Sequence, residues 1–72
     1  MIEEMIGLCE KKLEWLQQRV ETWNDDHDRW FKAVVESNLA LLRRGIIDES
    51  MWVWDIYHQR KDGWFVNIHG SV

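Results

Sequence analysis

The chain has 72 residues, one cysteine, no proline, and a formal net charge of −4 from thirteen acidic and nine basic side chains. This length allows one small domain, which buries only a modest part of the surface that its unfolded chain exposes. The acidic balance counts against sequence-independent binding of nucleic acid, because such binding needs Lys and Arg to neutralise phosphates. A single cysteine excludes an intrachain disulfide, so the chain needs another source of stability.

Two other sources of stability are open to so short a chain, namely a second copy of itself and a core rich in aromatic rings. Six tryptophans, one tyrosine and two phenylalanines supply far more ring area than a domain of this size normally carries. Each ring buries roughly 150–250 Å². Since one small monomer cannot cover all of these rings, we expect some of them to meet a partner, and we expect a homodimer.

The sequence predicts a soluble, cytoplasmic protein. Residues 1–4 contain no basic region that leads into an apolar run, and so they differ from a secretory signal. No apolar segment approaches the length of a membrane span. Cys9 lies among apolar residues, and we interpret it as a small buried hydrophobe in a reducing compartment.

The most regular pattern in the chain predicts a helix over about residues 2–24. Apolar residues recur there at steps of four and three, the spacing that places side chains on one stripe of a helix. Further apolar residues, Trp15 among them, widen the stripe, so that one edge can face a partner chain and the other edge the rest of the same chain. We predict a dimer interface along the seam residues Ile6, Cys9, Leu13, Leu16, Val20 and Trp23. The flanking charges leave parallel and antiparallel pairing open.

The acidic segment 24–28 has two interpretations. Asp25 is a good N-cap with Asp28 three residues later, which indicates that a second helix begins there. Alternatively, the seven-residue pattern continues through the segment as one helix of about 60 Å, a length that only an oligomer would stabilise. We favour the break and a second helix over about residues 26–44, because a pair of helices lets a short chain cover itself.

The second predicted helix carries apolar side chains around most of its circumference, so we expect it to lie centrally. Arg43 and Arg44 suit the negative end of the helix dipole. Gly45 suits the left-handed position that follows many helices, and Ile46 can then fold back on Leu41. These features predict where the helix ends.

Beyond residue 50 the apolar pattern changes from helical spacing to alternation, which predicts an antiparallel β-hairpin over about residues 51–69. A three-residue turn at residues 61–63, with Gly63 in the left-handed position, keeps the two faces of the hairpin distinct. The alternative is a third helix capped by Asp48. We favour the hairpin because apolar residues run consecutively through residues 51–54. The predicted fold is therefore α+β, with two helices followed by a C-terminal β-hairpin.

One face of the predicted β-hairpin carries tryptophans that suit a core, whereas the opposite face mixes aromatic and polar side chains in the manner of a binding surface. An exposed strand edge also offers main-chain pairing to a partner. We predict that a protein partner contacts the opposite face through Val53, Asp55, Tyr57, Phe65, Asn67 and His69.

No pattern in the sequence predicts catalysis, a cofactor or a metal site. Asp25 to Asp28 bring three acids and a histidine together, but consecutive residues at a helix start point around the axis, so we interpret them as capping residues. His58 and His69 lie on opposite faces of the predicted hairpin and should not share an ion. Asp55 beside either histidine has no nucleophile to activate. We therefore expect no enzyme activity and no cofactor.

These features predict a small acidic module that binds another protein stoichiometrically, as an inhibitor or an adaptor. In being short, acidic and rich in tryptophan, the chain is similar to the small bacteriophage proteins of host takeover and anti-defence. The alternative is a small dimeric transcription regulator that binds nucleic acid and presents four basic residues on one exposed face. Those residues are Arg43, Arg44, Arg60 and Lys61.

Overall fold

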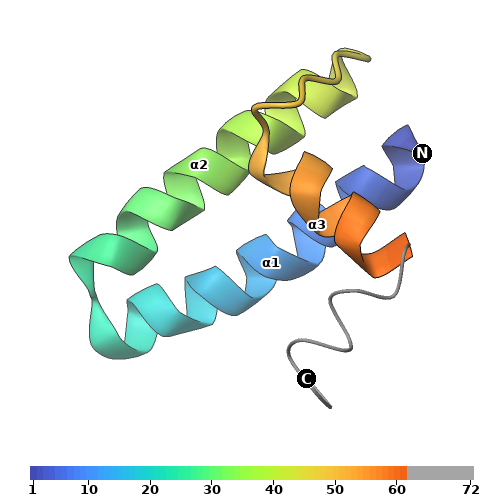
Figure 1. The fold of residues 1–72 in the computed structure, drawn as a ribbon. Coiled ribbons are helices and arrows are strands. Elements are labelled where there is room, and N and C mark those ends of the chain that lie inside the picture. Colours follow the sequence, from blue (N-terminus) through green and yellow to red (C-terminus); the bar gives the residue numbers. More distant parts are fainter. Residues whose placement is uncertain (62–72) are drawn as a thin grey trace.

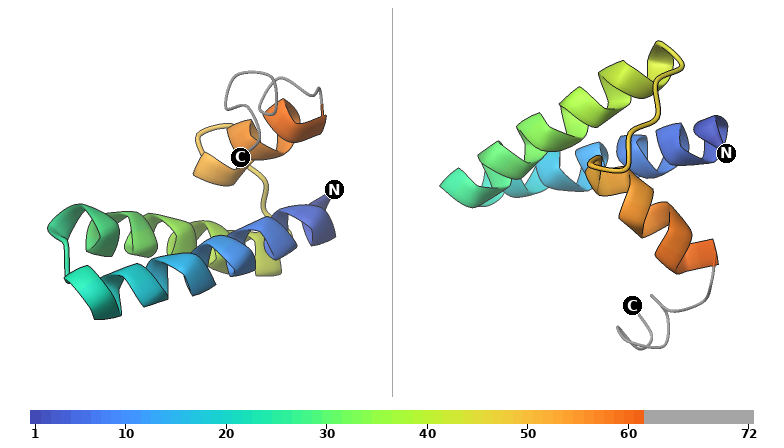
Figure 2. Two further views of the ribbon diagram at one scale, coloured as in Figure 1. Left: turned by 90° about the horizontal axis from the view of Figure 1, so that it is seen from below. Right: turned by 45° about the horizontal axis from the view of Figure 1, so that its top comes forward.

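The structure, a computed structural model, describes residues 1–61 and is helical throughout its regular elements. Helix α1 spans Ile2–Trp23, α2 spans Asp26–Arg43, and α3 spans Trp52–Lys61. α1 and α2 lie side by side in opposite directions, joined by a short connection at residues 24–25 (Figure 1). α3 lies across one face of this pair, toward the end that holds the N-terminus of the chain (Figure 2).

The predicted α+β fold with a C-terminal β-hairpin is wrong, because residues 1–61 contain no strand and the predicted first strand forms most of α3. In α3, side chains four residues apart lie on the same side of the helix and next to each other. Val53 and Tyr57 both lie in the core. The ring centroids of Trp54 and His58 are 4.3 Å apart. The predicted second strand lies outside the described residues.

The turn before α3 prepares the start of this helix. The N–H of Met51 donates to the backbone carbonyl of Asp48 at 3.0 Å. The N–H of Ser50 donates to Asp48 Oδ1 at 2.9 Å, and the hydrogen bonds from Ser50 lower the pKa of Asp48 below its usual value. The cap of α3 comes from another helix, because Asn38 Oδ1 of α2 accepts the N–H of Val53 at 3.1 Å. Asn38 thus takes the role that an N-cap side chain normally plays.

The predicted break between the first two helices is confirmed. Asn24 ends α1 in the left-handed conformation, with φ 51°, and its N–H donates to the carbonyl of Val20 at 2.9 Å. Asp25 begins α2 as its N-cap, because its Oδ2 accepts the N–H of Asp28 at 3.2 Å. Asp28 Oδ2 lies 3.0 Å from Arg19 Nε of α1. This ion pair joins the two helices at the end where the chain reverses.

The predicted end of the second helix is also confirmed. The N–H of Gly45 donates to the carbonyl of Leu42 at 2.9 Å, and the N–H of Ile46 donates to that of Leu41 at 3.0 Å. Gly45 has a φ of 81°. These are the two hydrogen bonds and the left-handed residue of a Schellman motif, which satisfies carbonyl groups that the helix leaves unpaired.

Gly45→Ala is expected to lower the free energy of unfolding by roughly 1–2 kcal/mol, because a Cβ atom disfavours the left-handed conformation. Nothing lies within 4 Å of a Cβ atom placed there, so the cost comes from the backbone. Gly7→Ala is the matched control. Gly7 lies inside α1 with equal space around it, and the same change should stabilise the chain by about 0.5–1 kcal/mol. Urea unfolding measures both, and effects of equal sign would contradict the conformational argument.

The core lies where the three helices meet. Six of its side chains are less than 2% exposed, and all three helices contribute to them: Met5, Cys9, Leu16, Val35, Leu42 and Val53. Three further buried side chains complete the core: Leu39, Met51 and Tyr57. Full burial of one such aliphatic side chain stabilises a fold by about 1.5–3 kcal/mol. The second helix was expected to lie centrally, but only one side of it is buried. Val35, Leu39 and Leu42 lie in the core, whereas Trp30 is 62% exposed.

Candidate functional site

A group of aromatic side chains lies exposed beside α3, on the face of the helix pair that α3 crosses. Trp15 of α1 is 47% exposed and Trp30 of α2 is 62% exposed. Phe31 and Trp52 are half-buried, and their rings meet edge to face with centroids 5.3 Å apart. His27 lies with its ring centroid 5.7 Å from that of Trp30. Among the described residues, two of the four large exposed hydrophobic side chains beyond Met1 thus belong to this group, Trp15 and Trp30.

Two basic side chains of α1 lie against three of these rings, and Trp30 and His27 join the group through Phe31, each with its ring centroid 6.4 Å from that of Phe31. Lys12 Nζ lies 4.3 Å from the ring centroid of Trp15, 5.6 Å from that of Phe31 and 5.9 Å from that of Trp52. Arg19 Cζ lies 4.9 Å from the ring centroid of Trp15. Cations at these distances are attracted to the faces of aromatic rings. The name aromatic surface is used below for this set of residues: Lys12, Trp15, Arg19, His27, Trp30, Phe31 and Trp52.

Helical spacing explains how the chain builds the aromatic surface. Lys12, Trp15 and Arg19 follow one another at steps of three and four, which places them on one side of α1. Phe31 faces them from α2, and Trp52 reaches them from the first turn of α3. Figure 2 shows that, among the described residues, α3 crosses only part of this face and leaves the end near the connection 24–25 uncovered. The rings come from three helices, and those of Trp15 and Trp30 remain exposed.

The two cations of the aromatic surface differ in their electrostatic surroundings. Arg19 pairs with the buried carboxylate of Asp28 at 3.0 Å. Lys12 belongs to none of the ion pairs found among residues 1–61. Burial lowers the pKa of Lys12 below its ordinary value, and the nearby charge of Arg19 adds to the effect. Lys12 is thus a partly desolvated cation that faces rings instead of a carboxylate.

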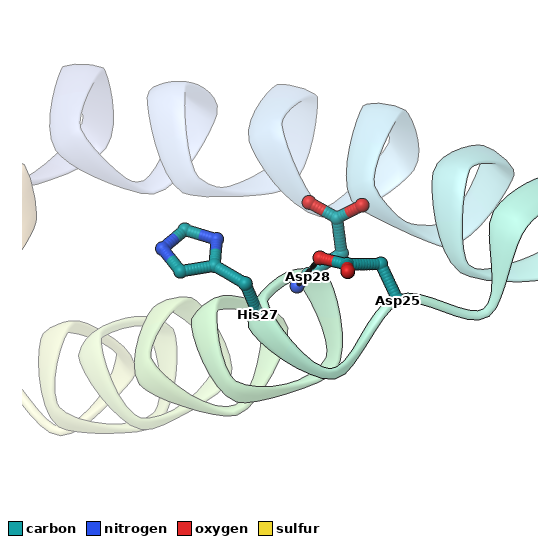
Figure 3. Close-up of side chains that lie close together, drawn as sticks. All are labelled: Asp25, His27 and Asp28. Carbon is teal, nitrogen blue, oxygen red and sulfur yellow. Dashed lines mark hydrogen bonds between the residues drawn. The ribbon is translucent and has the colours of Figure 1, made fainter.

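Asp25, His27 and Asp28 form the one group in the described residues with ligand atoms close enough for a metal ion, all within 4.8 Å of one another. Figure 3 shows them at the first turn of α2. The two carboxylates already have structural partners, since Asp25 caps the N–H of Asp28 and Asp28 pairs with Arg19. The predicted capping role of Asp25 is confirmed, and we assign no metal to this group.

The structure places the residues predicted to bind a partner in three different settings. Val53 is fully buried and Tyr57 is 7% exposed, so both belong to the core. Helical periodicity explains this difference from the prediction, because residues four apart in α3 turn to the same inner side. Asp55 is exposed. The other three residues of the predicted contact face lie outside the described residues: Phe65, Asn67 and His69. The described chain therefore does not assemble that face.

The predicted dimer seam of α1 packs largely within its own chain. Cys9 and Leu16 are fully buried, and Ile6 and Leu13 pack against the same core. The remaining seam residues are Val20, which is half-buried, and Trp23, which is 68% exposed. α2 and α3 thus occupy the apolar stripe that the sequence analysis assigned to a second copy. A homodimer stays a prediction.

Four basic residues were predicted to discriminate between a protein partner and nucleic acid. Arg43 Nη2 lies 3.4 Å from Glu10 Oε2 of α1, so its charge is partly balanced. Arg44 is exposed. The side chains of Arg60 and Lys61 lie outside the described part of the chain. Among these four residues, Arg44 is therefore the one described basic side chain that no ion pair balances.

The aromatic surface was not predicted from the sequence, although part of its signal is visible there. Lys12, Trp15 and Arg19 stand at helical spacing beside the apolar stripe of α1. This pattern predicts cations against a ring on the outer edge of that helix. The additions of Phe31 and Trp52 depend on how three helices converge, which no local pattern shows.

Burial raises the pKa of the Cys9 thiol to about 11, with a smaller contribution from Glu10. Because the thiolate is the reactive form, we expect a thiol reagent at about pH 8 to label the folded chain far more slowly than the chain in urea. The absorbance of the chromophore that the reagent releases measures both rates, and equal rates would contradict the burial of Cys9.

The Cys9 thiol keeps its proton to higher pH in the folded state than in the unfolded state. Its contribution to the free energy of unfolding is therefore complete below about pH 9 and is lost toward pH 11.

Comparison with protein-family models, with curated proteins and with solved structures finds no match for this chain. Within residues 1–61, none of the helices has both the length and the apolar character that a membrane crossing requires.

Proposed function

We propose that the chain is a small protein-binding module that acts stoichiometrically, as an inhibitor or an adaptor of another protein. The observation that carries this proposal is the aromatic surface, which exposes Trp15 and Trp30 beside Arg19. Tryptophan and arginine are among the residues most enriched at the energetic centres of protein interfaces. Each such ring offers a large apolar area at a low cost in conformational entropy.

The surface is also held in place before any partner arrives. Lys12 and Arg19 lie against the ring of Trp15, and Arg19 is itself fixed by Asp28. Phe31 and Trp52 hold each other by an edge-to-face contact. Preorganised side chains lose less entropy on binding, so a larger share of the contact energy appears as affinity.

Arg19 and Arg43 already have acidic partners, which favours a protein partner over nucleic acid. Arg43 is partly balanced by Glu10, Arg19 pairs with the buried carboxylate of Asp28, and the chain as a whole carries a net charge of −4. Binding of a nucleic-acid phosphate backbone needs several Lys or Arg side chains in a row that are not already paired with carboxylates. The four-residue basic face of a nucleic-acid-binding regulator is not assembled by the described residues.

The proposal is tested by crosslinking the chain in a cell extract, producing the captured protein in pure form, and measuring its affinity and the mass of the complex. The double variant Trp15→Ser, Trp30→Ser is expected to weaken binding about 30-fold or more, since each truncated interface tryptophan typically costs over 1 kcal/mol. Trp23→Ser is the control, because Trp23 is as exposed but lies outside the aromatic surface. Equal affinity of the double variant and the wild type would overturn the proposal. Light scattering on the chain alone, with the same variants, tests the expected homodimer.

A further inference from the structure

Lys12 occupies an unusual position on the aromatic surface. Its Nζ lies within 6 Å of three ring centroids, those of Trp15, Phe31 and Trp52. None of the ion pairs among residues 1–61 includes it. Burial and the neighbouring Arg19 both lower its pKa. A cation in such a place gains more from a carboxylate than a fully hydrated lysine does, because part of its desolvation has already occurred.

We propose that the aromatic surface binds an acidic peptide segment of its partner, with a carboxylate of that segment on Lys12 and an adjacent apolar side chain against Trp15 and Trp52. This inference rests on the proposed function and adds the chemistry of the partner to it. The carboxylate supplies a negative partner for the positive charge of Lys12, which belongs to none of the ion pairs among residues 1–61. The apolar side chain covers ring area that is open to water in the free chain.

The charges on and next to the aromatic surface favour an acidic peptide over a single-stranded nucleic acid, although aromatic rings can also stack on bases. Arg19, the other cation of the aromatic surface, is already paired with Asp28. Asp26 stands exposed in the first turn of α2, where it pairs with Arg29. A continuous row of phosphates would meet these carboxylates, whereas a peptide can place one carboxylate on Lys12 and uncharged groups elsewhere.

The experiment selects binders from a library of random short peptides displayed against the full chain. We expect the enriched peptides to carry Asp or Glu beside an aromatic or long aliphatic residue. The most enriched peptide is then synthesised together with a version in which the acid is replaced by its amide. The amide version is expected to bind the wild-type chain about tenfold more weakly, the effect of one charge-assisted hydrogen bond.

The same pair of peptides is measured on three variants of the chain. On Lys12→Gln, the acidic peptide and its amide version are expected to bind alike, because the carboxylate has lost its partner. Lys12→Arg keeps the charge and should retain most of the discrimination, which separates the ion pair from any effect of Lys12 on folding. Trp23→Ser should behave as wild type. Circular dichroism confirms that each variant folds.

The possible failures distinguish this inference from the proposed function. Selected peptides that lose binding in Trp15→Ser but ignore the change of acid to amide would overturn the acidic partner while the protein-binding surface stands. Selected peptides that are basic, or that bind Lys12→Gln with full discrimination, would do the same. If no peptide is selected and oligothymidylate binds with a steep dependence on salt, both the inference and the proposed function fail.

Discussion

Leu16→Ala is expected to lower the free energy of unfolding by roughly 2–5 kcal/mol, the largest effect among the substitutions considered for this chain. Leu16 is fully buried near the middle of α1. Truncation there removes apolar burial and leaves a cavity that the rigid neighbours fill only in part. In a domain of this size, such a loss is a large fraction of the total stability. Urea unfolding followed by circular dichroism measures it.

Trp23→Ala is the matched control for Leu16→Ala. Both residues belong to the apolar stripe of α1, but Trp23 is 68% exposed in the single chain. Its truncation should change stability by about 0.5 kcal/mol or less. If Trp23→Ala were as destabilising as Leu16→Ala, and if the loss grew on dilution, the stripe would be covered by a second copy instead of by α2 and α3.

The first two helices were predictable because their signals are local. The steps of four and three in α1 define one buried side. Asp25 and Gly45 mark helix ends by chemistry that acts within a few residues, through an N-cap hydrogen bond and a left-handed backbone. Such signals depend little on the rest of the fold, and so the sequence is sufficient to place them.

The third helix was not predicted because its apolar residues do not form a stripe. All four residues at positions 51–54 are apolar, and such a consecutive run resembles a strand when only the sequence is considered. In the structure Val53 faces the core while Trp52 extends toward Lys12 and Phe31. α3 packs against both α1 and α2. A short helix in such a position needs apolar residues on more than one side, and the surface that it packs against exists only after α1 and α2 have paired.

The candidate site was predictable only in part for the same reason. Trp15 was recognised as lying outside the narrow seam of α1, which is correct, and its exposure follows from that place. The predicted contact residues Val53 and Tyr57 depended on strand alternation, so the change to a helix turned them inward. The choice between helix and strand for ten residues therefore decides which side of the molecule can bind a partner.

Asn38→Ala is expected to detach the start of α3 from α2. Asn38 is 6% exposed; its Oδ1 accepts the N–H of Val53 at 3.1 Å and its Nδ2 donates to the carbonyl of Val34 at 2.8 Å. The substitution leaves a buried N–H without a partner, which costs roughly 1–3 kcal/mol. Hydrogen exchange should show the amide of Val53 exchanging about tenfold to a hundredfold faster relative to that of Leu13 in α1.

Asn38→Asp separates the cap from simple packing. A carboxylate keeps an acceptor for the N–H of Val53, and negative charge is favourable at the start of a helix. The change removes the donor to Val34 and buries a charge, so overall stability should fall, yet the exchange of the Val53 amide relative to that of Leu13 should stay near the wild-type value. Equal acceleration in Asn38→Ala and Asn38→Asp would show that Asn38 acts through packing alone. Since Trp52 begins the same helix, loss of the cap should also weaken any partner held on the aromatic surface.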